Sequence, residues 1–293
     1  MKHLAFFLLF LLLLCWFSGC AVTEQPDIAA TTLPVYEFTA RLCQGTGLTV
    51  TRLITESVSC LHDYTLQVQQ MRQIQGAHAV VISGAGLEDF LEDALTSTHN
   101  IIDASHGLSL MDAGHSHIHE HEDQGHVHVE DPHIWLSVAN AKLMAENICR
   151  GLQQLYPNHA GIFSSNLTLL LSDLDALQTY GEKALANLSC RELVTFHDGF
   201  SYLAESFDLH ILHAIEEESG SEASAAQLKD LIRIVRDYSL PAVFTEVNGA
   251  TSAADIVSSE ATIPVFSLDM AVSGNSYFDA MYYNIDTLRE ALQ

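Results

Sequence analysis

The sequence predicts an α/β fold in which two parallel-sheet lobes are joined by one long helix. Short apolar segments alternate with helical segments in the first half of the chain, and the same alternation returns in the last third. Between the two sets, residues 159–188 contain no proline, and leucines recur there near the helical period. Strands that alternate with helices favour a parallel sheet with helices on both faces.

The first set of elements lies before residue 158. Alternating or continuous apolar residues predict strands at 28–32, 48–54, 79–82 and 100–103. Helical spacing predicts helices at 35–42, 65–75, 87–95 and 137–155. Ser137 can cap the last of these helices, and Pro157 ends it.

The segment 159–188 predicts a helix of about 25–30 residues, roughly 40 Å long. Its apolar positions are Ile162, Leu167, Leu170, Leu171, Leu174, Leu177 and Leu185. Because such a helix is longer than most and lies in mid-chain, we expect it to act as a stiff spacer between lobes. The alternative is two ordinary helices that meet near Gly181.

The second set of elements follows the long helix. Strands are predicted at 192–196, 209–215, 242–245 and 265–268, and helices at 200–207, 223–238, 252–260 and 277–292. We therefore divide the chain into four parts: a signal peptide (1–20), an N-terminal α/β lobe (21–158), a linking helix (159–188) and a C-terminal α/β lobe (189–293).

The amino terminus resembles a secretory signal that ends in a lipoprotein cleavage box. Lys2 opens it, residues 4–17 are almost purely apolar, and Ser18-Gly19-Cys20 follows, although Phe17 stands where an aliphatic residue is usual. The apolar run is short for a permanent membrane helix. We expect lipidation of Cys20, with an uncleaved N-terminal anchor as the alternative. Either arrangement places the body of the protein outside the cytoplasmic membrane, at the cell surface or in a periplasm.

The charge balance narrows the class of partner. The chain has 12 Lys and Arg against 37 Asp and Glu, a formal net charge of −25. Nucleic acid is excluded as an expected partner, since binding phosphates needs a basic surface. An acidic surface instead raises the local concentration of cations.

Four cysteines follow the predicted anchor: Cys43, Cys60, Cys149 and Cys190. In an exported protein they can form two disulfides, and local pairing favours Cys43 with Cys60 and Cys149 with Cys190. Free, buried thiols are the alternative. No C-x-x-C pair is present, so a thiolate zinc site or a redox motif is not expected.

Histidines gather in a segment at 113–130 that has no apolar periodicity. Its histidines are His115, His117, His119, His121, His126 and His128. Imidazole is the commonest protein ligand for borderline transition metals, so we expect a solvated loop that collects metal. A purification-like tag or a solubility linker is the alternative, but tags normally lie at a terminus. His133 follows between Pro132 and an apolar pair, and we interpret it as a fixed ligand.

Ligands in open α/β sheets bind at the carboxyl ends of strands. Metal-ligating residues that follow predicted strands are His62, His133, His197 and Asp269. Three imidazoles and one carboxylate suit a tetrahedral Zn²⁺ ion. Each residue alone can equally be a capping or surface polar group, so the hypothesis depends on the set. Glu246 also follows a strand and is the rival carboxylate, and water is a third candidate for the fourth position.

Four motifs resemble the solute-binding lipoproteins of zinc and manganese ABC importers. They are Cys60-Leu61-His62-Asp63-Tyr64, Asp131-Pro132-His133-Ile134-Trp135, Phe196-His197-Asp198-Gly199-Phe200 and the late Asp269. The resemblance implies a metal held in the cleft between the lobes by His62, His133, His197 and Asp269. In manganese importers of this family a glutamate replaces the third histidine, so His197 favours Zn²⁺ over Mn²⁺.

We therefore expect a monomeric, membrane-anchored protein that captures Zn²⁺ and delivers it to an ABC permease and its ATPase. A metal-dependent surface adhesin is the alternative. A zinc hydrolase would need an open coordination position and a general base, and no H-E-x-x-H or other hydrolase motif is present. We accordingly predict that the chain is not an enzyme.

Overall fold

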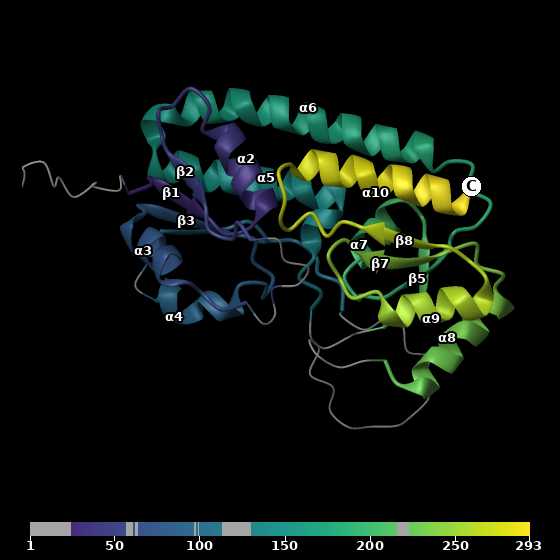
Figure 1. The fold of residues 1–293 in the computed structure, drawn as a ribbon. Helices are drawn as coiled ribbons and strands as arrows, with labels where there is room; N and C mark the ends of the chain where they lie inside the picture. Colours follow the sequence, from purple (N-terminus) through teal and green to yellow (C-terminus); the bar gives the residue numbers. More distant parts are fainter. Residues whose placement is uncertain are drawn as a thin grey trace, which may run out of the picture.

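The computed structural model describes residues 25–56, 61, 64–96, 98, 100–112, 130–215 and 223–293. Its N-terminal lobe is built on a parallel sheet with the strand order β2-β1-β3-β4. The strands are β1 (Ile28–Ala30), β2 (Val50–Arg52), β3 (Ala79–Ile82) and β4 (Ile101–Asp103). Figure 1 shows this lobe at the left, in purple and blue. The predicted signal peptide, Cys20, His62 and the His-rich loop lie outside the described residues.

Helices cover both faces of the N-terminal sheet because its strands are apolar on both sides. Ile28 and Ala30 pack into the core beneath α2 (Leu33–Leu42) and α5 (Val138–Leu155). Ala29 packs on the opposite face, towards α3 (Val68–Gly76), the 3-10 turn η1 (Asp89–Leu91) and α4 (Glu92–Leu95). The Ser137 side chain accepts a hydrogen bond from the amide of Asn140, so the predicted cap of α5 is confirmed.

The C-terminal lobe repeats this architecture with the parallel strand order β6-β5-β7-β8. Its strands are β5 (Glu192–Thr195), β6 (His210–Ala214), β7 (Val243–Glu246) and β8 (Val265–Leu268). One face packs against α8 (Ala225–Asp237) and α9 (Ser252–Ala261) in a separate apolar cluster. The other face is covered by α7 (Ser201–Ser206) and α10 (Tyr277–Leu292). The fold class predicted from the sequence is confirmed.

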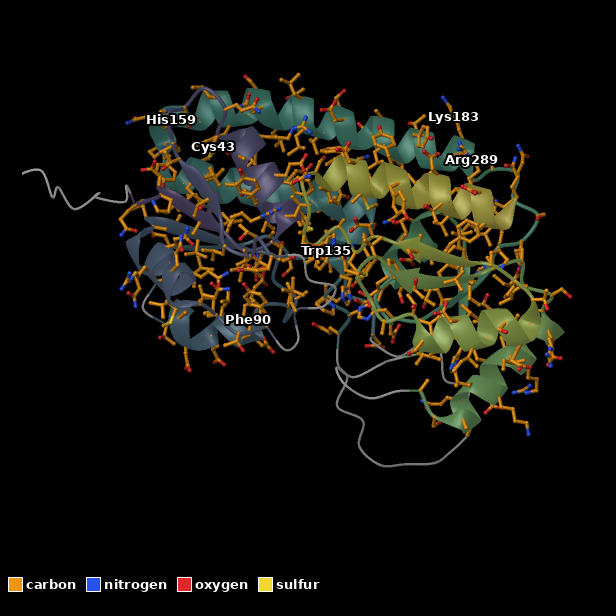
Figure 2. All side chains as sticks on the ribbon, in the orientation of Figure 1. Cys43, Phe90, Trp135, His159, Lys183 and Arg289 are labelled. Atoms are coloured by element: carbon orange, nitrogen blue, oxygen red, sulfur yellow. The ribbon has the colours of Figure 1, made fainter. Side chains whose placement is uncertain are left out.

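One helix, α6 (Ala160–Ala184), runs along both lobes (Figure 1). It has 25 residues, which corresponds to about 38 Å, and Gly181 does not interrupt it. Its buried face carries Phe163, Leu170, Leu174 and Leu177 against α5 and α10. Side chains fill the space between α6, α10 and the strands below, and Trp135 lies where the two lobes meet (Figure 2). A single apolar cluster therefore extends from β1 to α10.

Two local predictions are corrected. The helix expected at 87–95 begins only at Asp89 and is split into η1 and α4. The chain first passes through left-handed conformations at Gly84, Ala85 and Gly86, with φ angles of 84°, 55° and 81°. A right-handed helix cannot include such residues, so it starts after the turn.

The predicted disulfides are also wrong for the described cysteines, because Cys43, Cys149 and Cys190 are free thiols. Cys149 lies on α5 beside the first half of α6, whereas Cys190 follows the far end of α6. The helix between them holds them too far apart for a bond that needs α-carbons within about 7 Å. Cys43 is buried, and burial raises the pKa of its thiol to about 12, which leaves it unreactive. Among the described residues no helix is both long and apolar enough to cross a membrane.

Candidate metal site

His133 is held in a buried turn before α5. The amide of Asp131 donates to the carbonyl of Met111 (2.8 Å), which fixes the entry to this turn. Asp131 Oδ1 then accepts two hydrogen bonds from His133, one from its amide at 2.9 Å and one at Nδ1 at 2.7 Å. His133 is buried, with 5% of its surface exposed. With Nδ1 bonded to a carboxylate, the lone pair that can ligate a metal lies on Nε2.

His197 follows β5 in the C-terminal lobe. Its Nδ1 lies 3.2 Å from Oε1 of Glu246, which ends the neighbouring strand β7. Gly199 lets the chain turn closely around the ring, since a Cβ there would lie 2.6 Å from His197 Cδ2 and 2.8 Å from Met270 Cε. His197 thus has the same arrangement as His133, in which a buried carboxylate contacts Nδ1 and leaves Nε2 as the ligating nitrogen.

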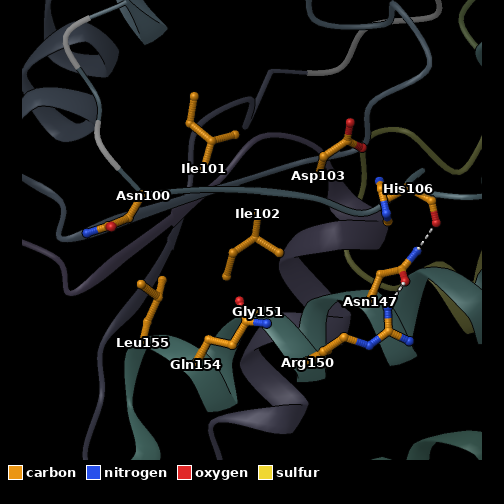
Figure 3. A pocket seen from close by; sticks show the side chains of 10 residues that line it. All are labelled: Asn100, Ile101, Ile102, Asp103, His106, Asn147, Arg150, Gly151, Gln154 and Leu155. Carbon is orange, nitrogen blue, oxygen red and sulfur yellow. Dashed lines mark hydrogen bonds between the residues drawn. The ribbon is translucent and has the colours of Figure 1, made fainter.

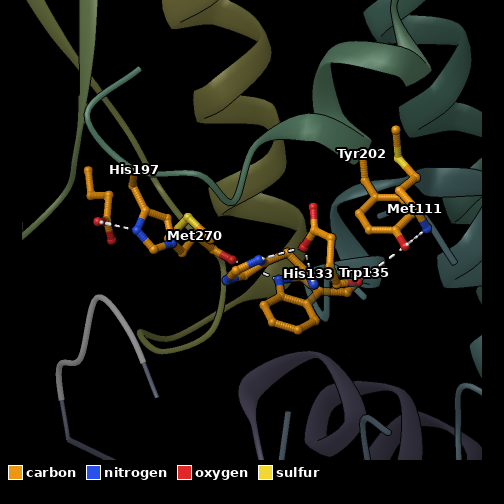
Figure 4. Close-up of polar contacts among 8 residues, drawn as sticks. Met111, His133, Trp135, His197, Tyr202 and Met270 are labelled. Atoms are coloured by element: carbon orange, nitrogen blue, oxygen red, sulfur yellow. Dashed lines mark hydrogen bonds and ion pairs between the residues drawn. The ribbon is translucent and has the colours of Figure 1, made fainter. Parts of the chain in front are cut away.

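The two histidines face each other from different halves of the chain (Figure 4). Their ring centroids are 5.3 Å apart and the rings are nearly perpendicular, with an interplanar angle of 85°. Two imidazole rings at this centroid separation can both reach one transition-metal ion, because each Zn–N bond is about 2.0–2.1 Å long.

Asp269 lies directly after β8, as predicted, but its carboxylate is engaged locally. Its Oδ1 accepts a hydrogen bond from the amide of Ala271 at 2.7 Å. The Asn284 side chain accepts from the Asp269 amide and donates to its carbonyl, each at 2.7 Å. Burial raises the pKa of Asp269 above its usual range, although the bond from Ala271 acts in the opposite direction.

The structure thus brings together two of the four predicted ligands. Within the described part of the chain, no three His, Cys, Asp or Glu side chains converge closely enough to hold a metal ion. Asp269 therefore does not form such a group with His133 and His197. Glu246, the rival carboxylate, lies against His197.

The sequence did not predict that Asp131 orients His133, and it did not predict the buried hydrogen bonds that hold Asp131 in place. Tyr202 on α7 donates to the Asp131 carbonyl at 3.2 Å and accepts from the Met111 amide at 2.8 Å. The D-x-H spacing was the available signal for Asp131. Tyr202 was not predictable, because its contact joins residues 71 positions apart.

A shallow hollow of about 460 Å³ lies elsewhere, between the edge strand β4 and α5 (Figure 3). Ile102 and Gly151 form part of its lining, and His106, Asn147 and Arg150 line its polar side. Asn147 donates to the carbonyls of Ala104 and His106, and Arg150 donates to Asn147. His133, His197 and Asp269 do not line this hollow, so it is separate from the histidine pair.

Comparison with solved structures shows that other proteins share this fold of two α/β lobes joined by one long helix. The zinc-bound ZnuA-like domain of AdcA from Streptococcus pneumoniae matches 92% of this chain and 99% of that domain, with a TM-score of 0.76 and 24% identity. The laminin-binding protein Lmb of Streptococcus agalactiae, described as a bifunctional adhesin and metal transporter, matches 92% of the chain with a TM-score of 0.76 and 22% identity.

A family model for the zinc-uptake complex component A, periplasmic, matches residues 28–291, and the chain belongs to this family. The resemblance seen in the sequence motifs is thereby confirmed. The family consists of uptake components rather than enzymes, in agreement with the prediction.

Among curated relatives, the zinc-binding protein AdcA of Streptococcus pyogenes is 28% identical over 285 residues. The match covers 89% of this chain and 55% of the relative, so the chain spans about half the length of the curated relatives that it matches.

Proposed function

We propose that this protein captures Zn²⁺ outside the cytoplasmic membrane and delivers it to an ABC permease and its ATPase. The observation that carries the proposal is the facing pair His133 and His197, each with Nδ1 against a buried carboxylate. Carboxylate-backed imidazoles are typical of zinc ligands, since the second bond fixes the tautomer and the ring orientation. Membership of the zinc-uptake family supports the same function.

The proposed ligand set is His62, His133, His197 and Asp269. His62 would complete the three imidazoles that favour Zn²⁺ over Mn²⁺. Asp269 is the proposed fourth ligand, with water as its rival, because contact with His197 gives Glu246 an orienting role instead. The Ala271 amide is bonded to Oδ1 of Asp269, so Asp269 would bind metal either through Oδ2 or by giving up this hydrogen bond.

The remaining parts of the proposal concern the anchor and the loop. Lipidation of Cys20 would hold the monomer at the membrane beside its permease. The histidines of residues 113–130 would bind additional zinc more weakly, because ordering a chain segment around an ion costs conformational entropy.

Calorimetric zinc titration of the full chain in mild detergent tests the site. We expect one tight event that is lost in His197→Ala and retained in His210→Ala, a matched change of an exposed histidine on β6. Deleting residues 114–129 should remove only weaker events. If the tight event instead disappears with the loop and survives His197→Ala, the cleft site is refuted.

Growth in zinc-depleted medium tests delivery. Deleting the gene should slow growth, and added zinc should restore the rate. The His197→Ala protein should fail to complement the deletion, whereas His210→Ala should succeed. Unimpaired growth of the deletion strain would contradict import and favour the adhesin alternative.

A further inference from the structure

The connection between β8 and α10 changes its hydrogen-bonding partners at Asp269. The Asp269 backbone is bonded to Asn284 of α10, within the C-terminal lobe. Residues 270–277, which we call the strap, are bonded to the N-terminal lobe instead. These bonds include Trp135 Nε1 to Met270 O (2.7 Å), Leu33 N to Val272 O (3.1 Å), Arg52 Nη1 to Gly274 O (2.7 Å) and Tyr277 N to Glu37 Oε2 (2.6 Å).

The strap is held in a defined shape. Ala271 adopts a left-handed conformation with a φ of 52°, which few residues other than glycine populate. Such a conformation persists only where surrounding contacts determine it. The Ala271 amide also donates to the Asp269 carboxylate, so the shape of the strap fixes where that carboxylate points.

Trp135 contacts both segments that carry proposed ligands. It is fully buried, two residues after His133, and its ring meets the His133 ring edge-on at 5.6 Å. Its indole Nε1 donates to the carbonyl of Met270, the residue that follows Asp269. Its own carbonyl accepts a hydrogen bond from the Tyr277 hydroxyl at the end of the strap (2.9 Å). The Trp135 side chain thus links the turn of His133 to Met270, the residue next to Asp269 (Figure 4).

We propose that Trp135 is a positioning residue for the metal site, which sets the distance between His133 and Asp269 through its hydrogen bond to Met270. The inference rests on the proposed zinc-binding function. The indole N–H is the essential group, because no other aromatic side chain of similar shape offers a donor at that position. Without it, the Met270 carbonyl would be left buried without this partner, and the strap would shift to find another.

Two consequences follow. If the distance between the two ligand-bearing segments is less well fixed, a small tetrahedral ion binds more weakly. Mutating the groups that orient metal ligands typically lowers metal affinity by about 10–100-fold. The preference for Zn²⁺ over Mn²⁺ should also fall, because ions with longer bonds and more ligands tolerate a wider site. The fold should survive, since the backbone bond from Leu33 to Val272 and the packing of the ring remain.

The test removes the donor in two ways. Trp135→Phe removes the N–H together with part of the buried ring system, whereas incorporation of 3-benzothienylalanine at position 135 keeps both rings while sulfur replaces the N–H. Tyr156→Phe is the control, because it removes a hydroxyl that lies 3.0 Å from His78 Nδ1 in the N-terminal lobe, away from the strap. Zn²⁺ and Mn²⁺ dissociation constants are measured for the full chain in detergent, together with hydrogen exchange of the Ala271 amide without metal.

We expect both Trp135 variants to bind Zn²⁺ at least 10-fold more weakly, with a smaller Zn²⁺ to Mn²⁺ affinity ratio, and Tyr156→Phe to match the parent. Exchange of the Ala271 amide should be at least 10-fold faster in the benzothienyl protein. If the Zn²⁺ dissociation constant is unchanged and only the thermal stability falls, Trp135 stabilises the core and does not position the metal site. If the parent shows no tight zinc binding, the proposed function fails. Unchanged exchange of the Ala271 amide would separately refute the positioning role of Trp135.

Discussion

At the scale of single residues, the two facing imidazoles depend on the carboxylates behind them. Asp131 contacts His133 from the same turn, whereas Glu246 contacts His197 from a neighbouring strand. A carboxylate that accepts from Nδ1–H fixes the tautomer and raises the basicity of Nε2. We therefore expect both carboxylates to act on metal affinity without ligating the ion.

Replacing Glu246 with glutamine tests this role. We expect Glu246→Gln to weaken zinc binding by about 10–100-fold with unchanged stoichiometry, because an amide orients the ring less well and adds no negative charge. Glu260→Gln, on the exposed end of α9, is the control. Titration calorimetry gives both quantities. Complete loss of the tight event would instead identify Glu246 as a ligand, and unchanged affinity would exclude the orienting role.

The residues around the histidine pair could be predicted from the sequence only in part. His197 and Glu246 were each visible as polar residues after a strand. Their contact was not, because it requires β5 and β7 to be neighbours, and strand order is set by packing rather than by position in the chain. His133 was predictable from its motif. The hydrogen bonds from Tyr202 to Asp131 and from Trp135 to Met270 were not, because no spacing rule encodes them.

At the scale of elements, Gly181 is a packing residue and not a helix breaker. A Cβ at this position would lie 2.3 Å from Phe207 Cε1 and 3.1 Å from Ile285 Cδ1. The missing side chain therefore lets α6 approach α10 and the end of α7. Gly161 lies near the start of the same helix, and a Cβ there would meet nothing within 4 Å. The two glycines thus form a matched pair, one in a tight contact and one in open space.

We expect Gly181→Ala to lower the free energy of unfolding by about 1–3 kcal/mol, because overpacking outweighs the gain in helix propensity. Gly161→Ala should raise it by roughly 0.5–1 kcal/mol, since only backbone entropy and helix propensity change there. Urea unfolding of both variants measures these differences. Equal stabilisation of both would show that the contact with Phe207 relaxes without cost.

The ends of β1 and β3 are joined by Glu88, which is buried. Its carboxylate accepts from Thr31 Oγ1 (2.6 Å) and from the amides of Ser83 (2.7 Å) and Gly84 (2.9 Å). Burial raises the pKa of Glu88 to about 7, although these hydrogen bonds act in the opposite direction. The folded protein consequently holds this proton more tightly than the unfolded chain.

The contribution of Glu88 to stability should be complete below pH 4.5 and should be lost as the pH rises through about 7. We therefore expect the free energy of unfolding of the parent, relative to Glu88→Gln, to fall by about 2–3 kcal/mol between pH 5 and pH 8. Urea titrations at several pH values measure the difference. Parallel pH profiles for the two proteins would show that Glu88 stays ionised when buried.

At the scale of the whole molecule, one rigid helix and a strap bonded across the lobes restrict their relative motion. The long helix packs against α5 of one lobe and α10 of the other, and hydrogen bonds from the strap also link the two lobes. Hinge closure over a large angle would break these contacts. Metal capture should therefore involve local movement around the histidine pair.

Small-angle X-ray scattering tests this restriction. We expect the radius of gyration to change by less than about 1 Å between zinc-free and zinc-loaded protein, as befits small shear movements rather than a wide hinge. Scattering from the protein without residues 114–129 serves as the control for ordering of the loop. A decrease of several ångströms in both proteins would contradict a rigid linker.

The two-lobed architecture was predictable from the chain because both alternating sets and the long helix leave periodic patterns. The disulfide prediction failed because proximity in sequence does not measure distance across a rigid helix. The delayed start of the helix after β3 was also missed, since Ala85 gives no sign of its left-handed conformation.

The apolar cluster that continues from β1 to α10 has a consequence for folding cooperativity. Neither sheet has a complete core of its own, because α6 and α10 supply apolar surface to both sides of the junction. Loss of either lobe would expose that surface on the other, so partially folded species with one intact lobe are disfavoured. We therefore expect the two lobes to unfold together rather than one at a time.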